Sequence, residues 1–308
     1  MQFKFDIYQR RFIQPLRTSH GIWQVREGII ISLSDEITGK VSQGEIAPLP
    51  WFGSETMTQA LHFCQQLGAT VAEADIAAIP DTLPACQFAF ESALGNLSED
   101  DQQNNNADLN YCYLLPAGEQ ALTTAQSLYN EQFPTTFKWK IGVYPLATEI
   151  TILRQLVSSF PAQTKLRLDA NGGLNLQQAK KLLEVTDNMP ALEFIEQPLP
   201  GGNFDEMLAL ANDYSTLLAL DESVANFNQL KAAHQQGWQG IFIIKAAIMG
   251  FPSRLRQFCQ DNYIDAVFSS VFETEIGRQA VLRLAKELSN HNRAIGFGVK
   301  HWFESKSD

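Results

Sequence analysis

The stretch "TTFKWKIGV", residues 135–143, places two lysines inside a segment that otherwise has the apolar composition of a buried β-strand. Side chains alternate between the two faces of a strand, so Lys138 and Lys140 share the face opposite to the aromatic residues Phe137 and Trp139. Charged groups are rarely taken out of water without a partner. The lysine face therefore predicts a polar interior in which these side chains have a chemical purpose.

Strand-like runs of the same kind recur at regular intervals from residue 111 onward, separated by stretches whose apolar residues repeat every three or four positions. The runs cover residues 111–115, 137–143, 165–170, 192–198, 217–223, 240–246, 265–272 and 293–298. Alternating strands and helices predict a parallel sheet in an α/β domain, and eight strands favour a closed β/α barrel. An open, doubly wound sheet is the alternative, but the glycine-rich turn that usually follows its first strand is missing.

The first hundred residues have a different pattern. Three runs with turns between them are typical of antiparallel strands, and "SETMTQALHFCQQLG" (54–68) is typical of a helix with a serine N-cap and a closing glycine. The polar segment 95–110 is the best candidate for a linker. We therefore predict a small α+β domain in residues 1–100, a barrel in 101–300 and a C-terminal tail in 301–308.

Composition narrows the classes of function. The 308 residues carry a net charge of -11 and no cluster of lysine and arginine, which disfavours binding to nucleic acid or to anionic membranes. No apolar run has membrane-spanning length, and the first residues lack the features of a signal peptide, so we expect a cytoplasmic location. The four cysteines have no metal-binding spacing and are expected to be buried.

Charged residues end five consecutive predicted strands. In chain order they are Lys140, Asp169, Glu196, Asp221 and Lys245. Active sites of β/α barrels lie at the C-terminal ends of the strands, so these side chains are expected at one rim. Three carboxylates on adjacent strands provide the hard oxygen ligands that suit Mg²⁺, with Mn²⁺ as the alternative.

The two lysines flank the predicted metal ligands. A nearby divalent cation and partial burial both disfavour an ammonium group, which lowers the pKa of a lysine toward that of a useful base. The combination indicates removal of a proton next to a carboxylate, with the metal stabilising the resulting enediolate. Taken alone, Asp169 is more typical of a helix N-cap, and Lys138 is more typical of a side chain that extends to solvent. Only the presence of all five charged residues at the same ends of their strands favours a catalytic site.

With these residues, the chain resembles members of the enolase superfamily over essentially its whole length. "KWK" (138–140) matches the Lys-x-Lys motif of its muconate-lactonising branch, whereas the mandelate-racemase branch has a histidine in place of the second lysine. Within this branch the chain is similar to the o-succinylbenzoate synthase family, which shares, in order, the motifs "GEIAPLPWFGSET", "LRLDAN", "FIEQP", "LDES", "IIKAAIMG" and "SSVFETEIG". The resemblance implies an N-terminal capping domain and a modified TIM barrel, (β/α)7β.

The resemblance also implies roles for individual residues. Metal binding falls to Asp169, Glu196 and Asp221. Lys140 is the implied base that takes the α-proton. Lys245, on the opposite side, is implied to stay cationic and to stabilise the enediolate, and Lys138 is implied to help hold down the pKa of Lys140. Asn171 and Glu222 are implied partners of the metal ligands, Ser269 and Gly296 match positions that contact substrate carboxylates, and His20 lies in an 18–23 loop expected to close over the site, where it is equally suited to face solvent.

The implied activity is that of a lyase of the hydro-lyase type: syn dehydration of 2-succinyl-6-hydroxy-2,4-cyclohexadiene-1-carboxylate to 2-succinylbenzoate, on the route to menaquinone or phylloquinone. Alternatives on the same scaffold are N-acylamino-acid racemase, dipeptide epimerase and muconate cycloisomerase. "GFG" (296–298) stands where dipeptide epimerases typically have Asp-x-Asp, which argues against that activity.

Two further classes of function were weighed. A Schiff-base aldolase using Lys140 or Lys245 would not need three aligned carboxylates, and a non-enzymatic metal-binding homologue would not need the complete set of lysines. The pattern predicts a small-molecule carboxylate as substrate. It leaves open whether the protein is a monomer or a homo-oligomer, how many substrates it accepts, and whether the 18–23 loop is ordered without ligand.

Overall fold

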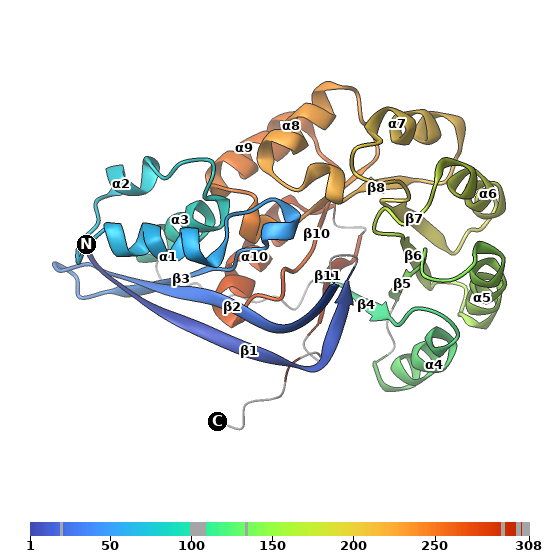
Figure 1. Ribbon diagram of the computed structural model, residues 1–308, viewed down its shortest axis with the longest axis horizontal. Coiled ribbons are helices and arrows are strands. Elements are labelled where there is room, and N and C mark those ends of the chain that lie inside the picture. Colours follow the sequence, from blue (N-terminus) through green and yellow to red (C-terminus); the bar gives the residue numbers. More distant parts are fainter. Residues whose placement is uncertain (19–20, 99–108, 133–134, 291–292, 300–302, 304–308) are drawn as a thin grey trace.

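The computed structural model describes all residues except 19–20, 99–108, 133–134, 291–292, 300–302 and 304–308. Two sheets organise the described residues: an antiparallel sheet with the order β1-β2-β3, and a parallel sheet with the order β10-β9-β8-β7-β6-β5-β4-β11. Figure 1 shows the antiparallel sheet and the first helices on one side of the molecule and the barrel on the other. The α+β domain followed by a barrel, predicted from the sequence, is confirmed.

The N-terminal sheet consists of two long strands and one short one. β1 (Gln2–Thr18) and β2 (Gly21–Ser34) form a hairpin, and β3 (Val41–Ile46) pairs with β2 in antiparallel fashion. Alternate residues of β2, namely Ile29, Ile31 and Leu33, are fully buried, as expected for a sheet with one face in a core. Two helices pack on the sheet, α1 (Met57–Gln66) on β2 and α3 (Pro84–Ser98) on β2 and β3, while the short helix α2 (Glu73–Ala77) packs on α3.

Two details of the predicted N-terminal region were wrong. The N-cap of α1 is Thr56, whose side chain accepts a hydrogen bond from the amide of Gln59. Ser54 cannot serve there because its hydroxyl accepts a hydrogen bond from the amide of Leu49, 2.6 Å away, in the preceding turn. Residues 95–98 belong to α3 and not to a linker; residues 99–108 of that predicted linker lie outside the described residues.

The parallel sheet closes on itself. Its strands are β4 (Tyr111–Leu115), β5 (Thr136–Lys140), β6 (Lys165–Asp169), β7 (Leu192–Glu196), β8 (Leu218–Leu220), β9 (Ile241–Ile244), β10 (Ala266–Phe268) and β11 (Ile295–Gly298). β11 pairs with β4, and a bridge between Ser269 and Gly296 joins the end of β10 to β11. The closed barrel is therefore confirmed, and the open sheet is wrong.

Helices connect successive strands of the barrel. In the described part of the chain they are α4 (Gln120–Gln132), α5 (Leu146–Ser159), α6 (Leu176–Thr186), α7 (Phe204–Asp213), α8 (Phe227–Gln235), α9 (Pro252–Asn262) and α10 (Glu275–Leu288), which gives the (β/α)7β arrangement. On β5, Phe137 stacks on Phe160 beside α5, so the apolar face of the strand packs toward the helices. The lysine face of β5 consequently faces the barrel interior, as predicted.

The carboxylate of Glu45 joins the N-terminal domain to the barrel. Glu45 lies on β3 and is 1% exposed. It accepts hydrogen bonds from the amides of Thr274 and Gly277, each 2.9 Å away, at the start of α10, and from the hydroxyl of Tyr8. A Cβ atom at Gly277 would lie 2.8 Å from the carboxylate, so glycine is needed for this approach. Two of the motifs quoted above, "GEIAPLPWFGSET" and "SSVFETEIG", thus meet at one contact.

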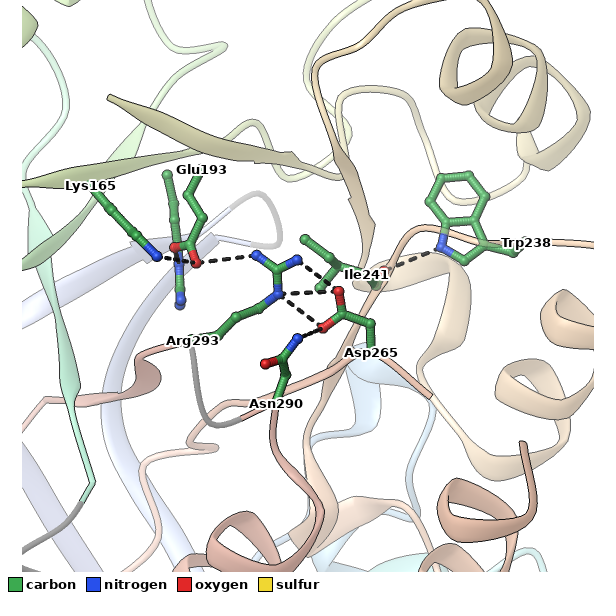
Figure 2. Close-up of polar contacts among 8 residues, drawn as sticks. Lys165, Glu193, Trp238, Ile241, Asp265, Asn290 and Arg293 are labelled. Atoms are coloured by element: carbon green, nitrogen blue, oxygen red, sulfur yellow. Dashed lines mark hydrogen bonds and ion pairs between the residues drawn. The ribbon is translucent and has the colours of Figure 1, made fainter. Parts of the chain in front are cut away.

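A network of ion pairs closes the N-terminal end of the barrel (Figure 2). Arg293, just before β11, donates from Nε and Nη2 to Asp265, just before β10, and from Nη1 to Glu193 on β7. Glu193 is also paired with Arg167 on β6 at 2.7 Å and with Lys165 at 3.9 Å. All four ion pairs lie at or near the strand starts, on the end of the barrel opposite to the predicted site.

Among the described residues, none of the helices combines the length and apolarity needed to cross a membrane. The four cysteines are buried, as predicted. The predicted domain boundaries at residues 100 and 300 lie outside the described residues and stay a prediction. In the predicted tail, Phe303 is described: it pairs with Phe12 of β1 and stacks on its ring.

Candidate active site

The register of the barrel strands brings the predicted site residues to one rim. Lys140 on β5 is the partner of Asp169 on β6, and Asp169 is the partner of Glu196 on β7. Asp221 comes directly after β8, where it precedes the turn η2 (Glu222–Val224), and Lys245 comes directly after β9, where it precedes η3 (Ala246–Ile248). Three acids on β6 to β8 thus lie between lysines on β5 and β9.

A cavity of about 230 Å³ opens at this rim. All ten residues predicted for the site line it: Lys138, Lys140, Asp169, Asn171, Glu196, Asp221, Glu222, Lys245, Ser269 and Gly296. The N-terminal domain contributes the opposite wall through Leu16, Trp23, Leu49, Trp51 and Phe52. His20, predicted for the closing loop, lies outside the described residues.

The acids and lysines of the rim neutralise one another. Lys138 Nζ lies 2.8 Å from Asp169 Oδ2 and 3.0 Å from Glu196 Oε1, and Lys245 Nζ pairs with Asp221 Oδ1. The three acids are at most 6% exposed. Because a buried charge without a partner is costly, each ammonium group compensates a carboxylate that would otherwise be unpaired. The polar interior predicted from "KWK" consists of these ion pairs.

Burial and charge shift the proton affinities of these groups. Burial and the neighbouring Asp169 raise the pKa of Glu196 to about 7, and burial raises that of Asp221 to about 6 against the opposing effect of Lys245. Burial lowers the pKa of Lys138, but attraction to the acids outweighs it and the pKa lies well above its usual value. The rim therefore holds the ammonium group of Lys138 firmly, and burial makes Glu196 easier to protonate than an ordinary glutamate.

The donor set at the rim suits a hard divalent cation. Asp169, Glu196 and Asp221 supply the carboxylate oxygens that Mg²⁺ prefers, and Oε2 of Glu222 is buried without a hydrogen-bond partner at the same rim. Within the described ranges no three acidic, imidazole or thiol side chains already surround a common point. The carboxylates are paired with Lys138 and Lys245, so a metal ion bound by these acids would compete with the two ammonium groups for carboxylate oxygens.

Asn171 and Glu222 connect two of the strand ends; their role as partners of metal ligands stays a prediction. The amide of Asn171 donates to Asp169 Oδ1, and Asn171 Nδ2 donates to Glu222 Oε1, both at 3.1 Å. Asn171 has a φ of 43°, in the left-handed region that asparagine adopts more readily than most residues. Its conformation turns the side chain from the end of β6 toward the loop after β8.

Two buried residues that sequence reasoning missed orient the rim. Gln197 Oε1 accepts hydrogen bonds from the amides of Asp221 at 3.0 Å and Ser223 at 3.1 Å, which ties the end of β7 to the end of β8. Glu149 on α5 accepts from three successive amides of the loop that follows Lys140, beginning with Gly142 at 2.9 Å. Gln197 was detectable from its place directly after Glu196, and Glu149 from its place as an acid in the first turn of the helix that follows Lys140.

Arg167 was also missed, although the alternation of β6 signals it. It lies two residues before Asp169, on the same face of the strand, and lines the cavity. Its Nε donates to Glu193 at the other end of the barrel, while its Nη2 is buried without a partner. Arg167 therefore connects the floor of the cavity to the ion-pair network shown in Figure 2.

A (β/α)7β barrel with three acids between two lysines, covered by an α+β domain, is the arrangement of the enolase superfamily. The family profile described as "Enolase C-terminal domain-like" matches residues 120–306, and the profile described as "MenC, N-terminal domain" matches residues 16–97. The o-succinylbenzoate synthase of Thermosynechococcus vestitus is 37% identical over 98% of this chain and 94% of its own length. That of Edwardsiella ictaluri is 29% identical over 86% and 80%.

Solved structures agree. The crystal structure of o-succinylbenzoate synthase from Thermosynechococcus elongatus, with magnesium in its active site, superposes with a TM-score of 0.90 at 36% identity and covers 99% of this chain and 95% of that one. The chain belongs to the o-succinylbenzoate synthase family of the enolase superfamily, a family of lyases. The L-Ala-D/L-Glu epimerase of Bacillus subtilis has a TM-score of 0.81 over 99% of this chain and 91% of its own, but at 18% identity it shows the fold alone.

Proposed function

We propose that this chain removes water from 2-succinyl-6-hydroxy-2,4-cyclohexadiene-1-carboxylate to form 2-succinylbenzoate. The observation that carries the proposal is the order of groups around one cavity: Lys140, three buried acids, then Lys245, on five adjacent strands. Full-length similarity to o-succinylbenzoate synthases supports the choice of this reaction among those of the superfamily.

Asp169, Glu196 and Asp221 would hold Mg²⁺, which the related crystal structure contains in its active site. When bound, the cation supplies positive charge that stabilises negative charge developing on the substrate carboxylate. Lys138 lies on the same strand face as Lys140 and is paired with Asp169 and Glu196, so it stays a cation beside the proposed base.

Lys140 is the proposed base and acid of the elimination. Its amine takes the proton from the carbon next to the substrate carboxylate, and the electrons of that C–H bond pass to the carboxylate, which becomes an enediolate. These electrons return to form the new double bond of the ring as the C–O bond to the hydroxyl breaks, and the proton carried by Lys140 completes the departing water. A single group can perform both transfers because the proton and the hydroxyl leave from the same face of the ring.

Lys245 is the proposed electrostatic partner on the opposite side. It stays cationic, and it faces the negative charge that builds up on the substrate after proton removal. The described residues lining the cavity include four acids, Asp169, Glu196, Asp221 and Glu222, and, besides the proposed base, three cationic side chains, Lys138, Arg167 and Lys245.

Ser269 and Gly296 are proposed to contact a substrate carboxylate. They form the bridge that closes the barrel, and a Cβ atom at Gly296 would lie 3.0 Å from Ser269 Oγ. Only glycine leaves the hydroxyl of Ser269 free to turn toward the cavity. A Gly296→Ala variant is therefore expected to raise KM more than it lowers kcat.

The direct test is an assay of the purified protein with the cyclohexadiene substrate, in which 2-succinylbenzoate is quantified by chromatography with Mg²⁺ or with EDTA. Turnover that requires the metal supports the proposal. Turnover that survives EDTA and is abolished by borohydride in the presence of substrate indicates a Schiff base on lysine instead.

Racemisation of N-acylamino acids is the second candidate, because two lysines on opposite sides of the acids suit proton exchange on both faces of an α-carbon. Incubation with N-succinyl amino acids in D₂O tests it through deuterium incorporation at the α-carbon. Substrate range, a cytoplasmic location, a role in menaquinone or phylloquinone synthesis and the choice between monomer and homo-oligomer stay predictions.

A further inference from the structure

Lys245 has a second partner that the proposed reaction does not account for. Its Nζ lies 3.9 Å from the centroid of the Phe52 ring. The ammonium group is thus held between the carboxylate of Asp221, from the barrel, and the face of an aromatic ring from the N-terminal domain. A cation over the face of an aromatic ring is attracted by the electron density of the ring, and more strongly when water is excluded.

A tight turn fixes the backbone at Phe52. Phe52 ends the turn η1 (Pro50–Phe52), in which its amide donates to the carbonyl of Leu49 at 2.8 Å. The next residue, Gly53, has a φ of 96° and donates to the carbonyl of Pro50 at 3.1 Å. The proline restricts φ at one end of the turn and the glycine permits the left-handed conformation at the other. The point from which the Phe52 side chain extends toward Lys245 is therefore well defined.

We propose that Phe52 is a positioning residue for Lys245. The inference rests on the proposed function, in which Asp221 turns to a metal ion and Lys245 must remain cationic at a defined place. A carboxylate oxygen that binds a metal contributes less to its ion pair with lysine. The ring of Phe52 is a partner that a hard cation does not compete for, because Mg²⁺ prefers oxygen ligands.

This assignment gives the N-terminal domain a part in the chemical step beyond covering the cavity. Lys245 is correctly placed only when the domain is seated on the barrel, which the contacts of Glu45 with the start of α10 secure. An aromatic ring at residue 52 that contacted only the substrate would affect substrate binding. A ring that holds Lys245 affects the transition state, where the negative charge is largest.

Site-specific replacement of Phe52 by mono-, di- and trifluorophenylalanine separates these two roles. Fluorine withdraws electron density from the ring face while it nearly preserves the shape. We expect log kcat to fall in equal steps along the series, by about 10-fold in total, with KM changed less than twofold. Phe52→Leu should lose about as much kcat as the trifluoro variant, and Phe52→Tyr should retain most of the wild-type value. A flat kcat series with a rising KM would overturn the proposal.

Two controls make the result specific. Phe63 is half-buried in the same domain and packs edge-to-face on Phe90, so fluorination there should leave kcat unchanged. The second control measures thermal unfolding of the metal-free protein: the midpoint should fall along the Phe52 series when Lys245 is present and stay constant in a Lys245→Met background. This readout needs no turnover. Absence of dehydratase activity in the wild type would refute the proposed function, whereas equal slopes in both backgrounds would refute the contact.

Discussion

The two ends of the barrel contain charged clusters of similar composition and different design. At the N-terminal end, Glu193 and Asp265 are matched by arginines; at the C-terminal end, Asp169, Glu196 and Asp221 are matched by lysines. Both clusters are largely buried, and in both the acids are compensated. What differs is the type of cation and the empty space beside it: the cavity of about 230 Å³ adjoins the lysine cluster.

The choice of cation determines whether the acids can change partners. Arg293 donates from three nitrogens to two carboxylates, and the planar guanidinium group fixes these directions. A lysine ammonium is a compact charge on a flexible chain and can move without breaking a fixed geometry. We infer that the N-terminal cluster is built for stability and the C-terminal cluster for exchange, in which a metal ion and a substrate replace lysine contacts.

The sharpest test of this contrast is Lys140→Ala. Loss of the proposed base should lower kcat by about 10²–10⁴-fold, while the free energy of unfolding changes little because Lys140 is not fully buried. Product formation and urea denaturation measure the two quantities. Near-normal turnover in this variant would show that another group removes the proton.

Glu193→Gln should lower the free energy of unfolding and leave kcat nearly unchanged, which is the reverse of the result expected for Lys140→Ala. Removing one partner of a buried ion pair leaves Arg167 and Arg293 without full compensation, which is expected to cost about 3–5 kcal/mol of unfolding free energy. Urea denaturation gives this value, and kcat of the folded protein should stay within about twofold of the wild type. A large loss of kcat with unchanged stability would mean that the two ends are not separate in function.

Metal binding should depend on pH in a direction that the rim acids define. Burial raises the pKa of Glu196 to about 7 and that of Asp221 to about 6, so protons occupy these groups increasingly as the pH falls from 8 to 6. Because Mg²⁺ binds the ionised acids, its affinity should be higher at pH 8 than at pH 6, by about 10-fold. Calorimetric titration of the metal-free protein measures this change, and affinity independent of pH would contradict the assigned ligands.

The smallest effect is expected from Lys165→Met at the N-terminal end. Lys165 is about half exposed and its Nζ lies 3.9 Å from Glu193, so water screens the attraction. The expected cost is about 0–1 kcal/mol of unfolding free energy, with no change in kcat. Comparison with Glu193→Gln by urea denaturation shows whether the buried arginines carry the network; equal losses in the two variants would show that they do not.

Much of the architecture could be predicted because its signals are local. Alternation along "FKWKIGV" assigned two faces to β5, and repetition of strand and helix predicted the barrel. The rule that barrel sites lie at the C-terminal strand ends then brought Asp169, Glu196 and Asp221 to one rim. The predicted serine N-cap was wrong although a local pattern marks the correct residue: Thr56 and Gln59 form a capping box, and the hydroxyl of Ser54 is used by the amide of Leu49.

Part of the remaining site depends on contacts between distant segments. Phe52 reaches Lys245 from another domain, and this pairing has no signal in spacing, because residues brought together by folding have no fixed separation in the chain. Glu149 and Arg167 are local by contrast: Glu149 accepts from amides five to seven residues before it, and the alternation of β6 already placed Arg167 on the face of Asp169.

The sequence alone determined which side chains face the barrel interior and which strand ends carry charge, because the pleat of a strand alternates its side chains and parallel strands share their polarity. Only the tertiary structure decided which charges pair. Lys138 takes two carboxylates and Lys245 takes a carboxylate and a ring because the closure of the barrel and the seating of the N-terminal domain set those distances. The alternation of side chains depends only on neighbouring residues in the chain, whereas the pairing of charges depends on distances between residues that folding brings together.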